Sequence, residues 1–210
     1  MNYTLGRKSQ SLKKRAARNK GRAYSRPLHL GLTGGLASGK SSALKIFKAL
    51  GWKTISADEI VHQIYSEKGE SLERLRQEAT QSPRALKKLE AWIHPQVRKR
   101  VRKDLKENEG RSVVVEVPLL FEGKLASAFD AVLFVYAPKS LRKKRAVKRG
   151  MSPKLFEKLD SRQYSAKEKA KLSDLVLLNL DKKKLRQQIL AFQKLSCPLK
   201  RAATISKSIK

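Results

Sequence analysis

The stretch that decides the fold reads Gly34-Gly35-Leu36-Ala37-Ser38-Gly39-Lys40-Ser41. It fits the pattern G-x-x-x-x-G-K-[ST], which binds nucleotide phosphates when a strand precedes it and a helix follows. Residues 28–32 form a short apolar run that predicts a strand, and residues 40–50 carry apolar side chains at helical spacing. The sequence therefore predicts a site for the phosphates of a nucleoside triphosphate.

The residue types in this loop indicate its chemistry. Glycines let backbone N–H groups face the phosphate oxygens, and the start of the following helix adds partial positive charge. Lys40 is expected to reach the β- and γ-phosphates, and the Ser41 hydroxyl is expected to bind Mg²⁺. A nucleoside triphosphate and Mg²⁺ are therefore the ligands that we expect this loop to bind.

Other classes of nucleotide-binding protein fit less well. The fingerprint G-x-G-x-x-G of dinucleotide-binding dehydrogenases is absent from the loop, and the guanine-reading motif Asn-Lys-x-Asp occurs nowhere. With 210 residues the chain is also short for most motor or helicase cores. A kinase that acts on a small molecule fits these observations best.

Outward from the loop, apolar runs alternate with helical patterns, which is typical of strand–helix–strand units in a parallel sheet. Further strands are predicted at residues 53–56, 112–117, 131–136 and 174–178. Helices are predicted at residues 57–65, 71–108, 140–148, 153–164 and 182–195. We expect an α/β fold of the P-loop NTPase class, similar to nucleoside-monophosphate kinases, with helices on both faces of a parallel sheet.

The same patterns predict the organisation of the chain. Residues 28–195 are expected to form the kinase domain, with a helical insertion at about 66–108. Pro95 predicts a kink or a break within the insertion, and Ser152-Pro153 predicts the start of a helix. Residues 1–27 and 196–210 carry basic but no acidic side chains, so we expect flexible tails.

The charge balance is strongly basic, with 49 Lys and Arg against 18 Asp and Glu and a formal net charge of +31. Residues 28–195 alone carry 36 basic and 18 acidic side chains, so the domain itself is basic. This charge favours anionic partners such as nucleotides or nucleic acid. A nucleic-acid partner, bound through residues 1–27, is an alternative that we do not favour.

The sequence also argues against several other classes. Its single cysteine, Cys197, excludes a disulfide within the chain, and the three histidines lack the spacing of a zinc site. No apolar run approaches the 18 residues of a membrane span, and no apolar segment of the secretory kind follows the basic start. We expect a cytoplasmic protein without a membrane partner, and its oligomeric state is left open.

Two carboxylates are candidates for the chemistry. Asp58 follows the second predicted strand, which places it at the carboxyl end of the sheet beside the phosphate-binding loop. There it could accept the proton of an attacking hydroxyl, or it could serve only to cap the following helix. Glu116 could lie near Mg²⁺ at the end of the third strand, or it could pair with a basic neighbour.

Several motifs together resemble those of the dephospho-coenzyme A kinase family, in the order of that family and over residues 28–195. The resemblance rests on L-T-G-G-x-x-S-G-K-S from Leu32, S-A-D-E-I from Ser56, I-H-P from Ile93, V-P-L-L-F-E from Val117, and S-D-L-V from Ser173 with Asn179 after it. A phosphate-binding loop is common to many proteins, whereas the combination with A-D-E-I, H-P and V-P-L-L-F-E is specific.

The resemblance implies a function and a set of site residues. The reaction would be ATP-dependent phosphorylation of the ribose 3′-hydroxyl of dephospho-coenzyme A, the final step of coenzyme A biosynthesis. The implied ATP site comprises Gly34, Gly35, Ala37, Ser38, Gly39, Lys40, Ser41, Ser42, Arg145 and Arg149. The implied acceptor site comprises Asp58, His94, Pro118, Leu119 and Glu122. The implied catalytic residues are Asp58 as base, with Lys40 and Arg149.

The resemblance also implies that the helical insertion at about 66–108 binds the substrate and that a lid at about 139–165 closes over ATP. The two lid arginines belong to a basic cluster. Six Lys and Arg side chains lie between Arg142 and Arg149. We interpret most of them as solvated, and only Arg145 and Arg149 match the family pattern. An arginine fork suits a lid because it can clamp phosphate oxygens as charge shifts during transfer.

The sequence departs from the family pattern in three places. Ala37 stands where the family usually has Gly, which is a mild change only if that position avoids a positive φ. Ser56 stands where the family usually has Asp. The segment between Asp58 and His94 is shorter than usual, and the family's acceptor-side motif is not recognisable there. Ser56 removes one acid near the expected metal. The shortened segment falls on the acceptor side and leaves the expected ATP site intact, and a kinase for another small hydroxyl acceptor stays an alternative.

Overall fold

The β-branched and apolar runs of the sequence form the centre of the structure. The computed structural model describes residues 27–68, 78 and 82–196. Its five strands are β1 (His29–Gly34), β2 (Lys53–Ser56), β3 (Val113–Glu116), β4 (Ala131–Tyr136) and β5 (Leu175–Leu178). They pair in parallel in the order β2-β3-β1-β4-β5, so β1 lies in the middle of the sheet.

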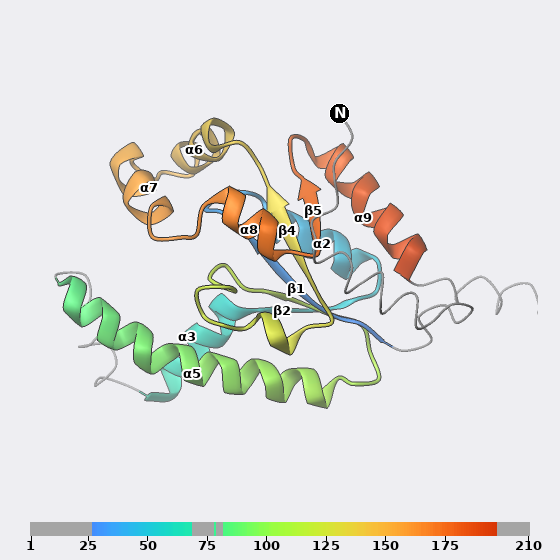
Figure 1. The fold of residues 1–210 in the computed structure, drawn as a ribbon, viewed down its shortest axis with the longest axis horizontal. Coiled ribbons are helices and arrows are strands. Elements are labelled where there is room, and N and C mark those ends of the chain that lie inside the picture. The colour runs from blue at the N-terminus through green and yellow to red at the C-terminus, as the bar shows by residue number, and fades with distance from the viewer. Residues whose placement is uncertain (1–26, 69–77, 79–81, 197–210) are drawn as a thin grey trace, which may run out of the picture.

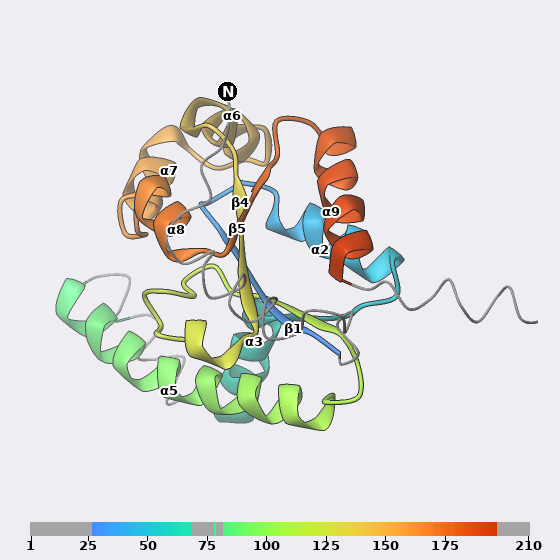
Figure 2. The same cartoon turned by 45° about the vertical axis from the view of Figure 1, so that its right-hand side comes forward.

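Helices cover both faces of this sheet (Figures 1 and 2). One face packs against α2 (Lys40–Ala49) and α9 (Lys182–Ser196), and the other packs against α3 (Ala57–Lys68) and α5 (Pro83–Glu107). Three shorter helices, α6 (Lys139–Lys148), α7 (Pro153–Asp160) and α8 (Ala166–Leu172), follow β4, and a 3₁₀ turn covers Ala126–Ala128. This arrangement confirms the predicted α/β fold with a covered parallel sheet.

The two faces are separated by the alternation of side chains along each strand. On β3, Val113 and Val115 face the helices α3 and α5, whereas Val114 faces α2 and α9. All three valines are fully buried, because a parallel strand with helices on both sides has no solvent face. Burial on both faces explains why the sequence of β3 is a continuous run of apolar residues from Val113 to Val115.

The structure differs from the expected elements in three details. Pro95 lies inside α5, which runs without a break from Pro83 to Glu107, so the predicted break is wrong. The helix that starts at Ser152-Pro153 ends at Asp160 rather than near 164, and Ser152 caps it as predicted. The helix α8 was not predicted, although Ser165 and Glu168 form a capping box at its start.

Parts of the expected organisation lie outside the described residues. These are residues 1–26 and 197–210 of the two expected tails, and residues 69–77 and 79–81 of the expected helical insertion. Across the described part of the chain, no helix is both long and apolar enough to cross a membrane.

The carboxyl ends of the strands meet at one edge of the sheet. The loop after β1 leads to the start of α2, β2 leads directly to Asp58 on α3, and β3 leads to Pro118. In open parallel sheets, ligands bind at this edge where the chain turns to opposite faces. The fold therefore brings together the segments on which the predicted site depends.

Candidate active site

The loop between β1 and α2 holds Lys40 at its base. Lys40 is 8% exposed, and its Nζ donates hydrogen bonds to the carbonyl oxygens of Gly34 at 3.1 Å and Gly35 at 3.2 Å. Gly39 precedes the helix with φ +97, and a Cβ there would collide with the amide of Asn179. The loop geometry is the one expected for a phosphate-binding loop that opens a helix.

Ala37 adopts a left-handed backbone conformation, with φ 56. This φ is unfavourable for residues with a Cβ and easy for glycine. The replacement of the family's Gly is mild only if the position avoids a positive φ, and the structure shows that it does not. Ala37 therefore carries backbone strain within the loop.

Residues from the end of β5 support the back of the loop. The Nδ2 of Asn179 donates to the carbonyl oxygen of Ser38 at 2.7 Å, and Asn179 is 3% exposed. Arg145 donates to the carbonyl oxygen of Asn179 at 3.1 Å. The structure thus places Arg145, which was expected in the lid over ATP, against the segment that braces the loop.

Arg142 joins the loop to the helix α7. It is buried, and it donates to the carbonyl oxygens of Ala137 at 3.2 Å and Leu36 at 3.3 Å. Its guanidinium forms a two-pronged ion pair with the carboxylate of Asp160 at the end of α7. The interpretation of Arg142 as a solvated residue is wrong. Its ion-pair partner, Asp160, lies 18 residues away in the sequence, so the basic cluster around Arg142 gave no sign of this contact.

A cavity of about 480 Å³ opens in front of the loop. Its lining includes Ala37, Gly39, Lys40, Ser41 and Ser42 of the loop, Asp58 of α3, Glu116 of β3, and Arg149, Arg162 and Gln163 of the segment after β4. We call it the nucleotide cavity. It brings together five of the predicted loop residues, the predicted base and one of the two predicted lid arginines.

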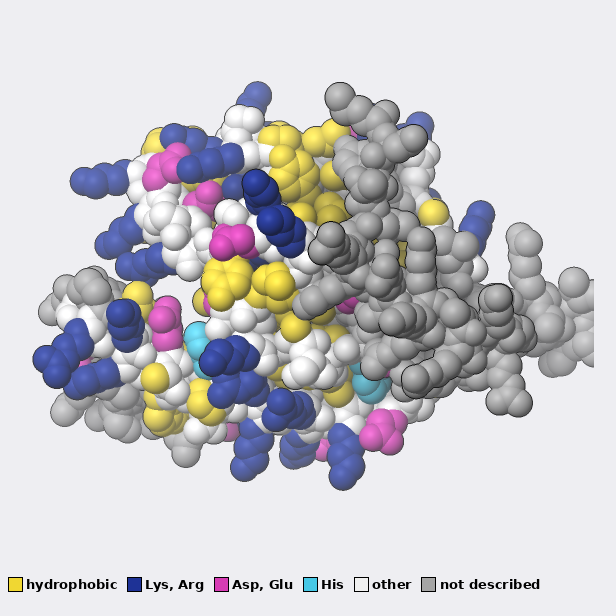
Figure 3. Space-filling view, in the orientation of Figure 1, with side chains coloured by type: hydrophobic (Ala, Val, Ile, Leu, Met, Phe, Trp, Pro, Cys, Tyr) yellow, Lys and Arg dark blue, Asp and Glu magenta, His cyan; other side chains and the backbone are white. Residues whose placement is uncertain are grey.

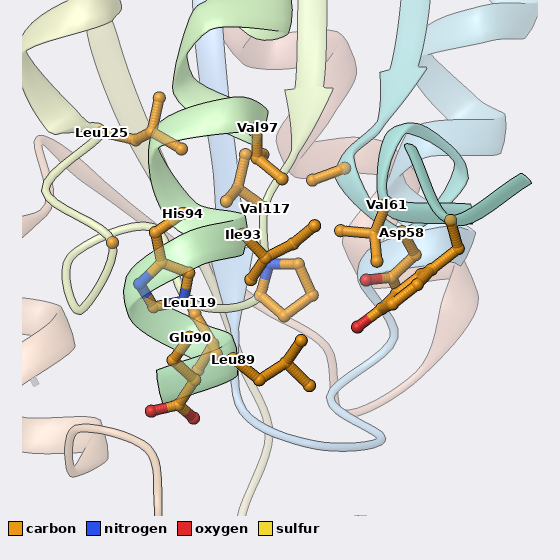
Figure 4. Close-up of a pocket in the computed structure, with 14 residues that line it drawn as sticks. Asp58, Val61, Leu89, Glu90, Ile93, His94, Val97, Val117, Leu119 and Leu125 are labelled. Carbon is orange, nitrogen blue, oxygen red and sulfur yellow. The ribbon is translucent and has the colours of Figure 1, made fainter. Parts of the chain in front are cut away.

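A second cavity of about 260 Å³ lies between α3 and α5, and we call it the acceptor cavity. Asp58 and Val61 of α3 line one side, and Leu89, Ile93 and His94 of α5 line the other (Figure 4). Most of the remaining lining is apolar, including Val117, Pro118, Leu119 and Leu125. The predicted acceptor residues Asp58, His94, Pro118 and Leu119 all line this cavity.

The two cavities meet at a small set of residues. Asp58, Glu90, Pro118 and Leu119 line both of them. Among these residues, Asp58 and Glu90 are the carboxylates, and Asp58 lies at the first turn of α3. A group held in the acceptor cavity can therefore meet a nucleotide phosphate beside Asp58, which is the arrangement that a transfer reaction needs.

Opposite charges face each other on the floor of the nucleotide cavity. Burial lowers the pKa of the Lys40 ammonium, and the carboxylates of Glu116 and Asp58 oppose that shift. Burial raises the pKa of the Glu116 carboxyl, with further contributions from Asp58 and Glu59, and Lys40 opposes it. The nearby Ser41 hydroxyl also acts to lower the pKa of Glu116, against the effect of burial. This cluster of coupled groups is typical of a functional site.

The donor set beside Ser41 fits a magnesium ion. No group of three or more His, Cys, Asp or Glu side chains suited to a metal occurs within the described ranges. Mg²⁺ does not need such a cage, because it is usually held by one or two protein oxygens together with substrate phosphates. The Ser41 hydroxyl and the Glu116 carboxylate supply hard oxygen ligands of this kind.

Some predicted site residues lie behind the cavities rather than in their lining. Gly34, Gly35 and Ser38 form the body of the loop, and the Oγ of Ser38 is buried without a hydrogen-bond partner among the described residues. The carboxylate of Glu122 faces Lys169 and the backbone of Tyr164. Arg162 and Gln163, which line the nucleotide cavity, and the buried Lys169 were not predicted from the sequence.

Comparisons with known proteins agree with this geometry. A family model described as dephospho-CoA kinase matches residues 28–82 and 73–184. The dephospho-CoA kinase of Zymomonas mobilis is 32% identical over 170 residues, covering 71% of this chain and 86% of the relative. That of Aquifex aeolicus is 30% identical over 171 residues, covering 71% of this chain and 87% of the relative.

Solved structures show the same relationship. A dephospho-CoA kinase from Campylobacter jejuni superposes with a TM-score of 0.61 at 27% identity, covering 80% of this chain and 96% of the other. A shikimate kinase from Aquifex aeolicus superposes with a TM-score of 0.54 at 19% identity, covering 80% of this chain and 96% of the other, which shows a shared fold. The fold is therefore that of P-loop kinases, and the chain is a kinase that belongs to the dephospho-CoA kinase family.

Proposed function

We propose that this protein transfers the γ-phosphoryl group of ATP to the 3′-hydroxyl of the ribose of dephospho-coenzyme A, which yields coenzyme A and ADP. The observation that carries the proposal is the position of Asp58, which lines both the nucleotide cavity and the acceptor cavity. A carboxylate at this junction is within reach of an acceptor hydroxyl on one side and of the phosphoryl group on the other.

Asp58 acts as the general base in this proposal. The acceptor hydroxyl gives its proton to the Asp58 carboxylate as its oxygen bonds to the γ-phosphorus. The bond between the γ-phosphorus and the oxygen that bridges it to the β-phosphorus breaks, and ADP leaves with that oxygen. Positioning the two reactants in adjoining cavities supplies much of the rate enhancement.

Cationic groups on the loop and beyond β4 balance the phosphate charge. Lys40 and Arg149 line the nucleotide cavity, and both supply positive charge where negative charge moves from the γ- to the β-phosphate. Ser41 and Glu116 would hold Mg²⁺, which neutralises phosphate oxygens when it is bound. Arg145 acts from behind the loop, through its hydrogen bond to Asn179.

The acceptor cavity suits the uncharged parts of a coenzyme precursor. Its lining from Val61, Leu89, Ile93, Val97 and Leu125 is apolar, with His94 at one side (Figure 4). Ligand sites commonly combine such a lining with a few placed polar groups. Here the polar groups of the junction, Asp58 and Glu90, would orient the ribose toward the nucleotide.

The test is an ADP-release assay with ATP, Mg²⁺ and dephospho-coenzyme A, run on the wild type and on Asp58→Asn. We expect turnover by the wild type and a loss of about 10²-fold or more in kcat for the variant, the usual scale for a general base. Glu59→Gln is the matched control, because Glu59 is the exposed neighbour on α3 and lines neither cavity.

Two outcomes would count against the proposal. Transfer to another small alcohol in place of dephospho-coenzyme A would keep the kinase chemistry and change the acceptor. An equal loss of activity in Asp58→Asn and Glu59→Gln would remove the general base from Asp58. Retained ATP affinity in both variants, measured by calorimetry, shows that the substitutions leave the loop intact.

A further inference from the structure

A buried lysine outside both cavities joins the segments that form their common wall. The side chain of Lys169, on α8, is 1% exposed. Its Nζ lies 3.0 Å from the carbonyl oxygen of Pro118, 3.1 Å from the Oε1 of Gln163 and 3.3 Å from the Oε1 of Glu122. An ammonium has three N–H donors, and here three acceptors surround it.

Each of these acceptors belongs to a part of the site. Pro118 lines both cavities, and Gln163 lines the nucleotide cavity. Glu122 closes the loop that begins at Pro118, and its Oε1 also accepts a hydrogen bond from the backbone N–H of Tyr164 at 2.8 Å. The ammonium of Lys169 therefore ties the loop at 118–122 to the connection between α7 and α8.

The carbonyl of Pro118 is held from two sides. The Oγ1 of Thr33, at the end of β1, donates to it at 3.2 Å, while Lys169 donates to it from α8. The backbone that forms the junction beside Asp58 is thus fixed between the central strand and the segment after β4. A shift of this carbonyl would move the boundary between the two cavities.

Stability alone is a poor explanation for this lysine. Moving a charge out of water is costly, and an apolar side chain of similar volume often stabilises a buried site as well as an ion pair does. Burial lowers the pKa of Lys169, and the Glu122 carboxylate opposes that shift. The Lys169 ammonium is buried in spite of this cost, and all three of its N–H donors face groups in the wall of the site. We take this arrangement to indicate a positioning role.

We propose that Lys169 is a positioning residue that aligns the acceptor with the nucleotide, by holding the loop at 118–122 against Gln163 and Tyr164. This proposal rests on the proposed function, because it assigns the wall between the cavities to the acceptor and the nucleotide. Lys169 touches neither reactant. Its loss removes the alignment and leaves the phosphate-binding loop in place.

The main test compares Lys169→Met with Lys171→Met. Methionine keeps the length and loses the charge, and Lys171 is an exposed lysine on the same helix. For Lys169→Met we expect the KM for dephospho-coenzyme A to rise and kcat to fall, each by roughly tenfold, the usual scale of coupling between sites. The Kd of a non-hydrolysable ATP analogue stays within about threefold of the wild type, as nucleotide contacts are retained.

A paired substitution separates positioning from folding. Lys169→Met leaves the Glu122 carboxylate buried without its cation, which destabilises the protein by itself. The double variant Lys169→Met with Glu122→Gln removes both charges and keeps an oxygen for the N–H of Tyr164. We expect its Tm to return toward that of the wild type, while the acceptor KM stays raised.

Hydrogen exchange tests the proposal without any acceptor. In Lys169→Met we expect faster amide exchange at residues 119–123 and 163–165 and unchanged exchange at residues 34–42. An unaltered exchange pattern, or an acceptor KM that recovers in the double variant together with Tm, would overturn the positioning role. Absence of wild-type turnover with dephospho-coenzyme A would instead overturn the proposed function, and the exchange experiment would still decide the role of Lys169.

Discussion

Ala37 shows how one Cβ changes the energy of the phosphate-binding loop. A left-handed backbone costs a residue with a Cβ about 1–2 kcal/mol, whereas glycine adopts it freely. Glycine also loses about 0.4–1 kcal/mol more conformational entropy on folding. Because Ala37 has φ 56, the first effect is the larger, and we expect Ala37→Gly to stabilise the protein by about 0.5–1 kcal/mol.

Thermal unfolding of Ala37→Gly beside Ala91→Gly checks this prediction. Ala91 is an exposed residue within α5, where glycine costs about 1 kcal/mol of helix stability. The same chemical change is thus expected to raise Tm in the loop and to lower it in the helix. A lower Tm for both variants would show that the strain at Ala37 is not released.

The buried carboxylate of Glu116 lowers the stability of the fold, although the proposed magnesium site needs its charge. Its carboxyl is 7% exposed, and burial raises its pKa above the ordinary value of 4.5. The folded protein therefore holds the proton more tightly than the unfolded chain does. The free energy of unfolding therefore falls as pH rises from the ordinary pKa to the raised pKa. Above the raised pKa the carboxyl is ionised in both states, and the loss of stability from burying its charge is complete.

Glu116→Gln removes this penalty. We expect the variant to gain Tm over the wild type at pH 7.5 and to gain less at pH 4.5, because the raised pKa lets the folded wild type keep more of the Glu116 proton at the lower pH. Its kcat falls by about tenfold or more, because the oxygen ligand set beside Ser41 loses its charge. A Tm difference that does not change between the two pH values contradicts the assigned pKa shift.

At the scale of elements, the attachment of α7 to the loop depends on one ion pair. Asp160 at the end of α7 is 14% exposed and pairs with the buried Arg142, which also binds the carbonyl of Leu36. Removing one partner of a buried pair leaves the other charge uncompensated, at a cost of about 3–5 kcal/mol. We expect Asp160→Asn to destabilise the protein on this scale.

Glu157→Gln on the same helix is the control for that prediction. Glu157 pairs with Lys139 at 2.6 Å and Lys143 at 3.1 Å, but its side chain is 43% exposed. Exposed pairs contribute about 0–1 kcal/mol because water screens them. Urea unfolding of both variants compares the two pairs directly, and equal losses of stability would contradict the assignment of Arg142–Asp160 as the main link.

The sequence predicted the strands, the helix starts and the site positions that depend on residues close by in the chain. The valines of β3 predicted a strand, and the strand before Asp58 placed that carboxylate at the correct edge of the sheet. Ser152-Pro153 predicted a helix start, since capping is a local interaction. These features depend on neighbours within a few residues.

Features that depend on distant partners could not be predicted in this way. Arg142 meets Leu36 across 106 positions and Lys169 meets Pro118 across 51, so no local spacing marks either contact. Pro95 is accommodated within α5, whose length and packed apolar face outweigh the local disruption. The burial of these basic residues follows from the tertiary fold.

At the scale of the whole molecule, the excess of basic side chains predicts how substrates are captured. Residues 28–195 carry 36 basic and 18 acidic side chains. Lys and Arg side chains project on both sides of the hollow between α5 and α7, with fewer acidic side chains among them (Figure 3). ATP and dephospho-coenzyme A are anions, so the field of the protein attracts both toward the cavities.

We therefore expect salt to slow substrate binding more than it slows the phosphoryl-transfer step. We expect kcat/KM for both substrates to fall by roughly tenfold between 0.03 and 0.3 M KCl, because the Debye length shrinks over this range and the surface charge is screened. We expect kcat to change by less than about twofold, because the bound reactants are shielded from solvent. Steady-state kinetics at each salt concentration checks this, with sucrose at matched osmolarity as the uncharged control. If kcat falls in parallel with kcat/KM, the salt acts inside the site on the ion pairs that hold it, and the surface charge has no part in capture.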